Sequence, residues 1–372
     1  MRTVSPEELD SLLKTSLSAT ELSLAGQDLS GRDYSGVIFQ QVDFGRANLS
    51  DCKLDECAFV QCNLNGARLR NTSLVDGALT ECNLERTDLS SACLKECLFH
   101  NCRLQGSRLQ SAEAREATFN ECVLAEADFG GAQMEMTRFT KSILHDCCFA
   151  EAHMEFTVFL SSQILRPDFR NLFMNRVVLL KANLQHAQMD GSRFYLCIFI
   201  DADLSGLDLS DKDFTLCQFM RADLTGVNFS RSKLAQCNFQ EARLTDACLA
   251  EVDAPNSIFI KAELGGADFR GANLFQGLFN GALAEHAVFT GANIYQSQWE
   301  GARCVAARMD QTDLTYADFS HCDLSGVDMA GAKMFRTCLH RVLDENAHIP
   351  ARAEALGEDS KRLAAERWRP PA

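Results

Sequence analysis

The sequence predicts a solenoid, a repeat architecture in which short units stack on one another and bury a shared core. Every fifth residue between Leu24 and Leu339 is apolar. A period of five is neither the 3.6 of an α-helix nor the 2 of a half-buried strand, so it indicates stacked repeats. Within it runs a second period of twenty, marked most clearly by Phe199, Phe219, Phe239, Phe259 and Phe279.

The five-residue register continues through sixty-four units without a slip. Two residues before each apolar centre the side chain is usually small, as at Ala47 and Cys52, and one residue before it Asp or Asn is common, as at Asn48. We therefore expect the central and small positions to point inward and the other three to face water.

Three segments carry a recognisable signature: Ala47-Asn48-Leu49, Ala127-Asp128-Phe129 and Ala267-Asp268-Phe269. Over about residues 21–340 the chain resembles the pentapeptide-repeat family, whose repeat is A(D/N)LXX. The resemblance implies an all-β solenoid, a right-handed quadrilateral β-helix with four pentapeptides in each coil. Sixty-four units would then make about sixteen coils.

The residues support four faces independently of the resemblance. Sorted by position modulo twenty, one column of centres is mostly Phe, including Phe39, Phe59 and Phe99, whereas another is mostly Leu, including Leu64 and Leu84. Like side chains stack on like when neighbouring coils lie one strand spacing apart.

The N-terminal segment, residues 1–20, is expected to form a short helical cap. Ser5, Pro6 and Glu8 occupy the N-cap, N1 and N3 positions of a capping box. Such a cap covers the first coil of a solenoid, whose open end would otherwise expose its core.

Two further segments depart from the regular repeat. Residues 160–182 place Pro167 and Leu172 where small residues are expected, which indicates a distorted coil, a seam, or a linker between two domains. Residues 341–372 lack the five-residue pattern and are expected to form a helical tail. The tail would serve as a C-terminal cap or, as in some members of the family, in dimerisation.

Composition restricts the function. A formal net charge of −15 and a pI of about 5.0 argue against direct nucleic-acid binding. The opening residues lack the apolar core of a secretory signal, and no apolar run is long enough to cross a membrane. We expect a cytoplasmic protein with reduced cysteines, although delivery by a specialised secretion system is compatible with the sequence.

The chemistry-bearing residues predict no active site. Twelve of the seventeen cysteines occupy the small inward position, where they act as small apolar residues. The eight histidines are expected to be scattered over the surface without a cluster. We therefore expect a protein that is not an enzyme, with no catalytic residues, no metal and no cofactor.

One candidate surface is anionic. Four carboxylates recur every twenty residues at one corner and should stack in a column: Glu56, Asp76, Glu96 and Glu116. Such a column is either a solvated corner or part of a surface that imitates DNA. The resemblance implies the second alternative, because some pentapeptide-repeat proteins bind DNA gyrase as mimics of B-form DNA and protect or inhibit it.

The other candidate surface is apolar. Positions that should face water beside the Phe column carry aliphatic or aromatic side chains in several coils: Phe156, Val158, Leu160, Val178, Leu180, Leu196, Ile198, Ile200, Leu216, Met220, Ile258 and Ile260. An exposed stripe of this kind marks an interface. A protein partner of unknown identity, a second copy of the chain in a homodimer, or the C-terminal tail would cover it.

The function predicted from these features is that of a non-enzymatic protein–protein interaction scaffold with a rigid face. Two alternatives stay open. One is the DNA-mimic that binds gyrase or a topoisomerase. The other, which the resemblance alone implies, is an accessory protein or effector of a bacterial secretion system.

Overall fold

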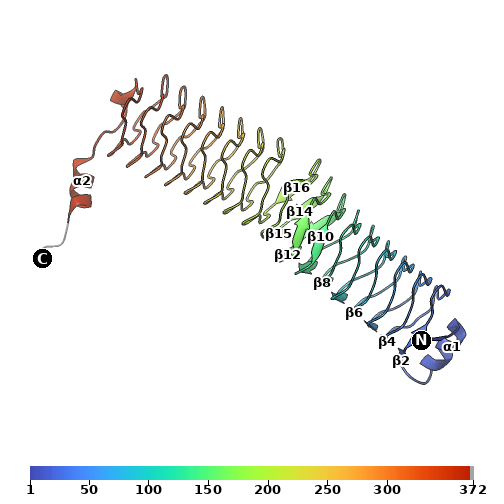
Figure 1. Cartoon of the computed structure of the whole chain (residues 1–372). Helices are drawn as coiled ribbons and strands as arrows, with labels where there is room; N and C mark the ends of the chain where they lie inside the picture. Colours follow the sequence, from blue (N-terminus) through green and yellow to red (C-terminus); the bar gives the residue numbers. More distant parts are fainter. Residues whose placement is uncertain (369–372) are drawn as a thin grey trace. The chain divides into compact units, whose positions relative to one another are not determined.

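The structure is a computed structural model, and it describes residues 1–368 (Figure 1). The chain forms β-solenoid coils and divides into two compact units, Met1–Ile198 and Phe199–Ala372. Each unit is described by itself below.

The first unit begins with the helical cap that the capping box predicts. Strand β1 (Arg2–Thr3) pairs in parallel with β3 (Leu22–Ser23), and helix α1 (Pro6–Leu13) lies between them in sequence. The backbone N–H of Glu8 donates to Ser5 Oγ at 3.2 Å, and the Ser5 N–H donates to Glu8 Oε2 at 2.9 Å. Leu9 of α1 is fully buried, so the helix closes the core at this end.

A nine-stranded parallel sheet follows the Phe column through the first unit. Each strand pairs with the strand twenty residues further on, so side chains twenty residues apart lie side by side. In spatial order the strands are β2 (Ser18–Thr20), β4 (Ile38–Gln40), β5 (Ala58–Val60), β6 (Ala78–Thr80), β7 (Leu98–His100), β8 (Thr118–Asn120), β9 (Arg138–Thr140), β12 (Val158–Leu160) and β15 (Val178–Leu179).

Two smaller parallel sheets cover other faces of the first unit near its end. Strand β10 (Ile143–His145) pairs with β13 (Gln163–Leu165). The second sheet has the order β11 (His153–Glu155), β14 (Phe173–Asn175) and β16 (Arg193–Tyr195).

The irregular segment 160–182 keeps the repeat. Pro167 and Leu172 are buried at small positions, and the centres Ile164 and Met174 remain buried beside them. The segment contributes β13, β14 and β15 to three ladders of the first unit, and the boundary between the two units falls later, after Ile198.

The second unit repeats the same geometry with single bridges in place of three-residue strands. Four bridges form in each coil, one to each five-residue unit; the first four are Asp203↔Asp223, Asp208↔Asn228, Asp213↔Lys233 and Gln218↔Asn238. This arrangement confirms the four faces that the columns of centres predict.

The number of coils in one stack differs from the prediction of about sixteen. In the first unit, pairing at intervals of twenty residues links ten successive levels from Ser18 to Ile198. In the second unit, pairing at intervals of twenty residues on another face links eight successive levels, from Asp203 to Leu343.

The repeat also continues beyond Leu339, where the apolar pattern ends. Asp323 bridges to Leu343 and Asp328 bridges to His348, so the start of the expected helical tail is still coiled like the solenoid. Helical structure follows in a 3₁₀ turn, η1 (Arg352–Glu354), and in helix α2 (Ser360–Arg367). No helix within residues 1–368 combines the length and apolar character that crossing a bilayer requires.

The core of each unit is a ladder of stacked rings. In the first unit Phe99 and Phe119 stack with centroids 4.8 Å apart. In the second, Phe259 and Phe279 also stack at 4.8 Å, and Phe279 continues onto the indole of Trp299 at 4.1 Å. All five rings are fully buried, so the Phe column is the widest layer of the core.

The small inward position has a second role that the sequence analysis missed. Side chains there donate a hydrogen bond to the carbonyl of the residue twenty-three positions earlier, which is a centre of the preceding coil. Cys57 Sγ donates to Tyr34 O at 2.9 Å, and Thr72 Oγ1 donates to Leu49 O at 2.8 Å. All twelve cysteines that were assigned to this position are buried.

Candidate functional site

The apolar residues predicted in the first unit lie around the last strands of the nine-stranded sheet. Val158 of β12 pairs with Val178 of β15, and Val178 bridges to Ile198. Leu160 is 47% exposed and Phe156 is 43% exposed. The other predicted members in this unit are half-buried: Val158, Val178, Leu180, Leu196 and Ile198.

Two exposed aromatic residues extend this apolar surface, and the sequence analysis missed them. Phe173 on β14 and Tyr195 on β16 have exposed side chains on the neighbouring three-stranded sheet. Phe173 precedes the buried centre Met174, and Tyr195 follows the buried centre Phe194. Val158 was selected as an apolar residue at an outward position next to a centre, and the same criterion would have selected these two.

The cation of Arg176 lies over one of these aromatic rings. The guanidinium carbon of Arg176 is 5.1 Å from the centroid of the Phe156 ring, which is within the range of a cation–π contact. The guanidinium therefore covers part of the ring, while Leu160 on β12 remains the more exposed of the two side chains.

The predicted apolar residues of the second unit are less well gathered. Ile200, Leu216, Met220, Ile258 and Ile260 are all half-buried. The bridged column that contains Ile258 reads Gln218, Asn238, Ile258, Leu278, so two polar side chains precede the apolar pair. The stronger apolar surface therefore belongs to the first unit.

The four carboxylates of the anionic column do stack at one corner. Each has a left-handed backbone, with φ between 55° and 58°. The Glu56 N–H donates to Val75 O and the Asp76 N–H to Lys95 O, which ties the corner of each coil to the next. Glu56, Asp76 and Glu96 are exposed, and Glu116 is half-buried.

Cations neutralise half of this column. Lys95 Nζ lies 3.6 Å from Glu96 Oε1, and Arg115 Nε lies 3.5 Å from Glu116 Oε1. These exposed pairs contribute little to stability, but they reduce the negative charge that the corner presents to a basic partner.

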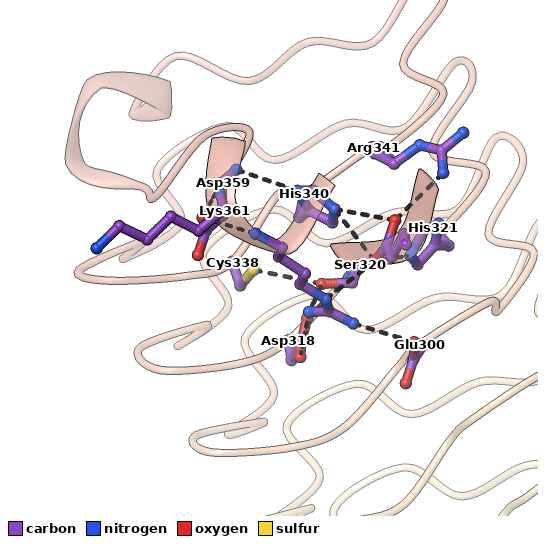
Figure 2. A network of polar contacts seen from close by, with 11 residues as sticks. Glu300, Asp318, Ser320, His321, Cys338, His340, Arg341, Asp359 and Lys361 are labelled. Carbon is purple, nitrogen blue, oxygen red and sulfur yellow. Dashed lines mark hydrogen bonds and ion pairs between the residues drawn. The ribbon is translucent and has the colours of Figure 1, made fainter. Parts of the chain in front are cut away.

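A third candidate site is a polar cluster that the sequence analysis missed. It joins α2 to the last coils of the second unit (Figure 2). We call it the α2 network. It consists of Glu300, Asp318, Ser320, His321, Cys338, His340 and Arg341 from the coils, with Asp359, Arg362 and Glu366 from the tail.

Arg362 binds one end of this network. Its guanidinium donates to Ser320 Oγ at 2.8 Å and to Glu300 Oε1 at 3.1 Å, and it lies 3.7 Å from Asp318 Oδ2. Ser320 also contacts Cys338, with Oγ and Sγ 3.3 Å apart. One cation is therefore surrounded by two carboxylates and a hydroxyl.

Glu366 binds the other end. It accepts from Arg341 Nη1 at 3.2 Å, and the His321 and His340 Nε2 atoms lie 3.1 and 3.4 Å from its Oε1. Partial desolvation would raise the pKa of Glu366, but the hydrogen bonds from Arg341, His321 and His340 outweigh it and lower that pKa to about 2. The carboxylate is therefore ionised at neutral pH.

The prediction that the histidines are scattered is wrong for one pair. The rings of His321 and His340 lie 5.5 Å apart, because a corner residue and a face residue nineteen positions later meet on adjacent coils. That spacing in the sequence could have revealed the pair. Glu366 could not have been found this way, because its position follows no repeat.

This cluster has the composition of a metal site but not its hydrogen bonding. The ligand atoms of His321, His340 and Glu366 lie within 4.8 Å of one another. However, the Asp359 N–H donates to His340 Nδ1 at 3.1 Å, which leaves the ring proton on Nε2, the nitrogen that faces Glu366. A metal ligand needs that lone pair free, so the geometry favours an ionic network.

Stacked five-residue turns with four bridges in each coil define a β-solenoid of pentapeptide coils. A family model described as the pentapeptide repeat region matches residues 33–109. A second, described as pentapeptide repeats (8 copies), matches residues 102–140, 119–155, 197–236, 237–276 and 300–341. Because these matches together cover more than half of the chain, the chain belongs to the pentapeptide-repeat family.

Solved structures of this kind are similar to the chain at low identity. QnrB1, a plasmid-mediated fluoroquinolone resistance protein, is 17% identical, with a TM-score of 0.38 over 54% of this chain and 90% of its own. HetL, involved in heterocyst differentiation regulation in the cyanobacterium Nostoc, is 18% identical, with a TM-score of 0.16 over 96% of this chain and 98% of its own.

A third structure is a pentapeptide repeat protein of the Arabidopsis thaliana thylakoid lumen. It is 27% identical, with a TM-score of 0.19 over 29% of this chain and 68% of its own. A search of the curated proteins found no match to this chain.

Proposed function

We propose that the protein is a non-enzymatic scaffold that binds a protein partner through the apolar surface at the end of the nine-stranded sheet. The observation that carries the proposal is the group of exposed or half-buried apolar side chains on the paired strands β12 and β15. Val158, Leu160, Val178 and Leu180 share this surface with the exposed ring of Phe156.

Three physical considerations support the proposal. Parallel sheets are usually covered on both faces, whereas the outer face of this one carries exposed leucine. Burying one leucine side chain stabilises a complex by about 1.5–3 kcal/mol. A side chain on a hydrogen-bonded sheet has little backbone freedom left to lose on binding.

The contacts of α2 give no support to the alternative in which the C-terminal tail covers the apolar surface of the first unit. The contacts of α2 described above are all with residues 300–341 of the second unit. We therefore propose a separate protein as the occupant of the apolar surface.

The double variant Leu160→Asp with Leu180→Asp tests this function. We expect the purified variant to keep its far-ultraviolet circular dichroism, because neither side chain is in the core, and to lose the partner recovered from the native cell. Thr80→Asp, on a distant strand of the same sheet, is the matched control and should retain the partner.

Light scattering on the same proteins separates the two kinds of partner. A mass that falls to that of one chain only in the double variant would identify a homodimer. Unchanged mass together with unchanged partner recovery would show that the surface is not an interface.

The DNA-mimic alternative has weaker support. Its carboxylates do form one column, and the chain carries a net charge of −15. Because Lys95 and Arg115 pair with two of the four carboxylates, the column lacks the unbroken negative charge that DNA presents.

A further inference from the structure

Helix α2 is held on the second unit by polar contacts. None of its residues is buried, so the helix adds no apolar core to the unit. Its two anchoring side chains, Arg362 and Glu366, are four residues apart and therefore lie on the same side of the helix. They also contact each other, with Arg362 Nε 3.2 Å from Glu366 Oε1.

The surface beneath Arg362 is formed to accept a cation. Ser320 is fully buried, although it occupies an outward position of the repeat. The equivalent residues of earlier coils, Ile260 and Asn280, are half-buried, so the tail is what covers Ser320. Glu300 and Asp318 supply two carboxylates, which form charge-assisted hydrogen bonds or ion pairs with a guanidinium.

The surface beneath Glu366 has the opposite character. His321, His340 and Arg341 converge on one carboxylate. His340 is fully buried, and both of its ring nitrogens have partners, Asp359 N–H on one side and Glu366 on the other. A cation-accepting site and a carboxylate-accepting site therefore lie side by side, separated by one helical turn.

We propose that this surface is a docking site for a helix of a partner protein that carries an arginine and, four residues later, a carboxylate. Helix α2 is then the chain's own competitor for the site. The charge complementarity of Arg362 and Glu366 with the two halves of the surface specifies the chemistry of the partner. The inference rests on the proposed function, namely that this protein binds proteins, and it adds a second surface to it.

Competition is consistent with a tail whose helix is held by polar contacts and has no buried residue. An attached helix acts at an effective concentration in the millimolar range, so it can hold a site through modest contacts. Its ion pairs with Glu300 and Arg341 are partly exposed, so salt screens them and each contributes little. A partner helix that adds apolar contacts of its own would therefore displace α2.

The test uses a fluorescent peptide with the sequence of residues 358–368 and the full-length chain. In the receptor variant Arg362→Ala with Glu366→Ala, the attached helix can no longer compete. Fluorescence anisotropy should show that the peptide binds this variant at least about tenfold more tightly than it binds the unmodified chain. Circular dichroism checks that the variant is folded.

Two controls assign the binding to the half of the surface that accepts the arginine. A peptide with alanine in place of the arginine that corresponds to Arg362 should not bind, and Asp318→Asn in the receptor variant should abolish binding of the original peptide. Glu251→Gln removes an exposed carboxylate in another column of the same unit and should leave binding unchanged. Binding to neither chain, or binding that Asp318→Asn does not change, overturns the proposal. Equal binding to both chains overturns the competitor role.

Cys338 reports release of the helix without any added ligand. Its thiol lies beside Ser320 under Arg362, whereas Cys248 is equally half-buried in another column. Alkylation followed by peptide mapping should show Cys338 reacting several-fold faster in the receptor variant, with Cys248 unchanged. Equal rates for Cys338 in both chains would contradict a covering role for α2.

Two further outcomes separate the alternatives. Calorimetry with Zn²⁺ that shows binding lost on His340→Ala, with no peptide binding, would identify a metal centre and overturn the proposal. The double variant Leu160→Asp with Leu180→Asp lies in the other unit and should not change peptide binding. A negative peptide test therefore does not count against the apolar interface. A negative test of the apolar interface likewise does not count against the helix-docking site.

Discussion

At the scale of single residues, polar side chains at the small inward position donate a hydrogen bond to a carbonyl of the preceding coil, in most cases beside a backbone N–H that the same carbonyl already accepts. Cysteine, threonine and serine share this role: Cys322 Sγ donates to Trp299 O at 2.8 Å, Thr87 Oγ1 to Leu64 O at 2.9 Å and Ser142 Oγ to Phe119 O at 3.0 Å. This explains why these three residue types alternate with alanine at one position of the repeat. The abundance of cysteine therefore needs no redox chemistry.

Replacing Cys57 tests this role. Cys57→Ser keeps a donor for Tyr34 O and should change the free energy of unfolding by less than about 1 kcal/mol. Cys57→Val fills the space but removes one of the two hydrogen bonds that Tyr34 O accepts, the other coming from the Val37 N–H at 3.1 Å, and should cost about 0.5–1.5 kcal/mol. Urea unfolding of the two variants measures the difference, and equal stability would show that the hydrogen bond contributes nothing.

Residue patterns predicted the inward positions well because each coil repeats the same chemical demands. They did not predict the α2 network. Arg362 lies forty-two residues from Ser320 and sixty-two from Glu300 in sequence, and no periodicity relates them. Polar pairs between a repeat and a non-repetitive tail depend on the path of the tail, which the five-residue pattern does not constrain.

At the scale of elements, the ends of the repeat were harder to predict than its middle. The apolar pattern stops after Leu339, and the next central position is Asp344, whose carboxylate pairs with Arg352. The backbone nevertheless bridges to the preceding coil at Leu343 and His348. The backbone of the last coil can form its bridges with the preceding coil alone. An apolar centre in that coil would also need a further coil to cover it from water.

The N-terminal helix was predictable because a capping box is a local signal. Ser5→Ala should remove the hydrogen bond to the Glu8 N–H and destabilise α1 by about 1 kcal/mol. Hydrogen exchange at the amide of Leu9, which donates to Ser5 O, should quicken accordingly. Ser11→Ala, which alters an exposed hydroxyl of the same helix, is the control, and equal protection in both variants would contradict a stabilising cap.

At the scale of the whole molecule, the many buried thiols should lower the free energy of unfolding as the pH becomes alkaline. Burial raises the pKa of Cys57, Cys237 and Cys322 to about 12, above the ordinary thiol value of about 8.5. Below pH 8.5 these thiols are protonated in both the folded and unfolded chain, so their contribution is complete. Between about pH 8.5 and 12 only the unfolded chain ionises, and stability falls.

Urea midpoints measured from pH 8 to pH 11 check this expectation. The midpoint should decline as the pH rises, and the decline should be shallower in Cys237→Ser. This variant keeps a donor for Phe214 O but removes one ionising group. A slope identical to that of the unmodified chain would show that the Cys237 thiol does not contribute.

The vertical stacking of residues twenty positions apart has a consequence for how such a chain can change length. Within one unit, removing five residues turns every later segment by one face, so phenylalanine centres such as Phe239 would meet leucine centres and the core layers would no longer match. Removing or duplicating twenty residues keeps every column in register, because Phe259 stacks on Phe239 at the equivalent position of the next coil. Length is therefore quantised in whole coils, and a gene of this kind can grow or shrink by a coil while keeping both its core and its faces.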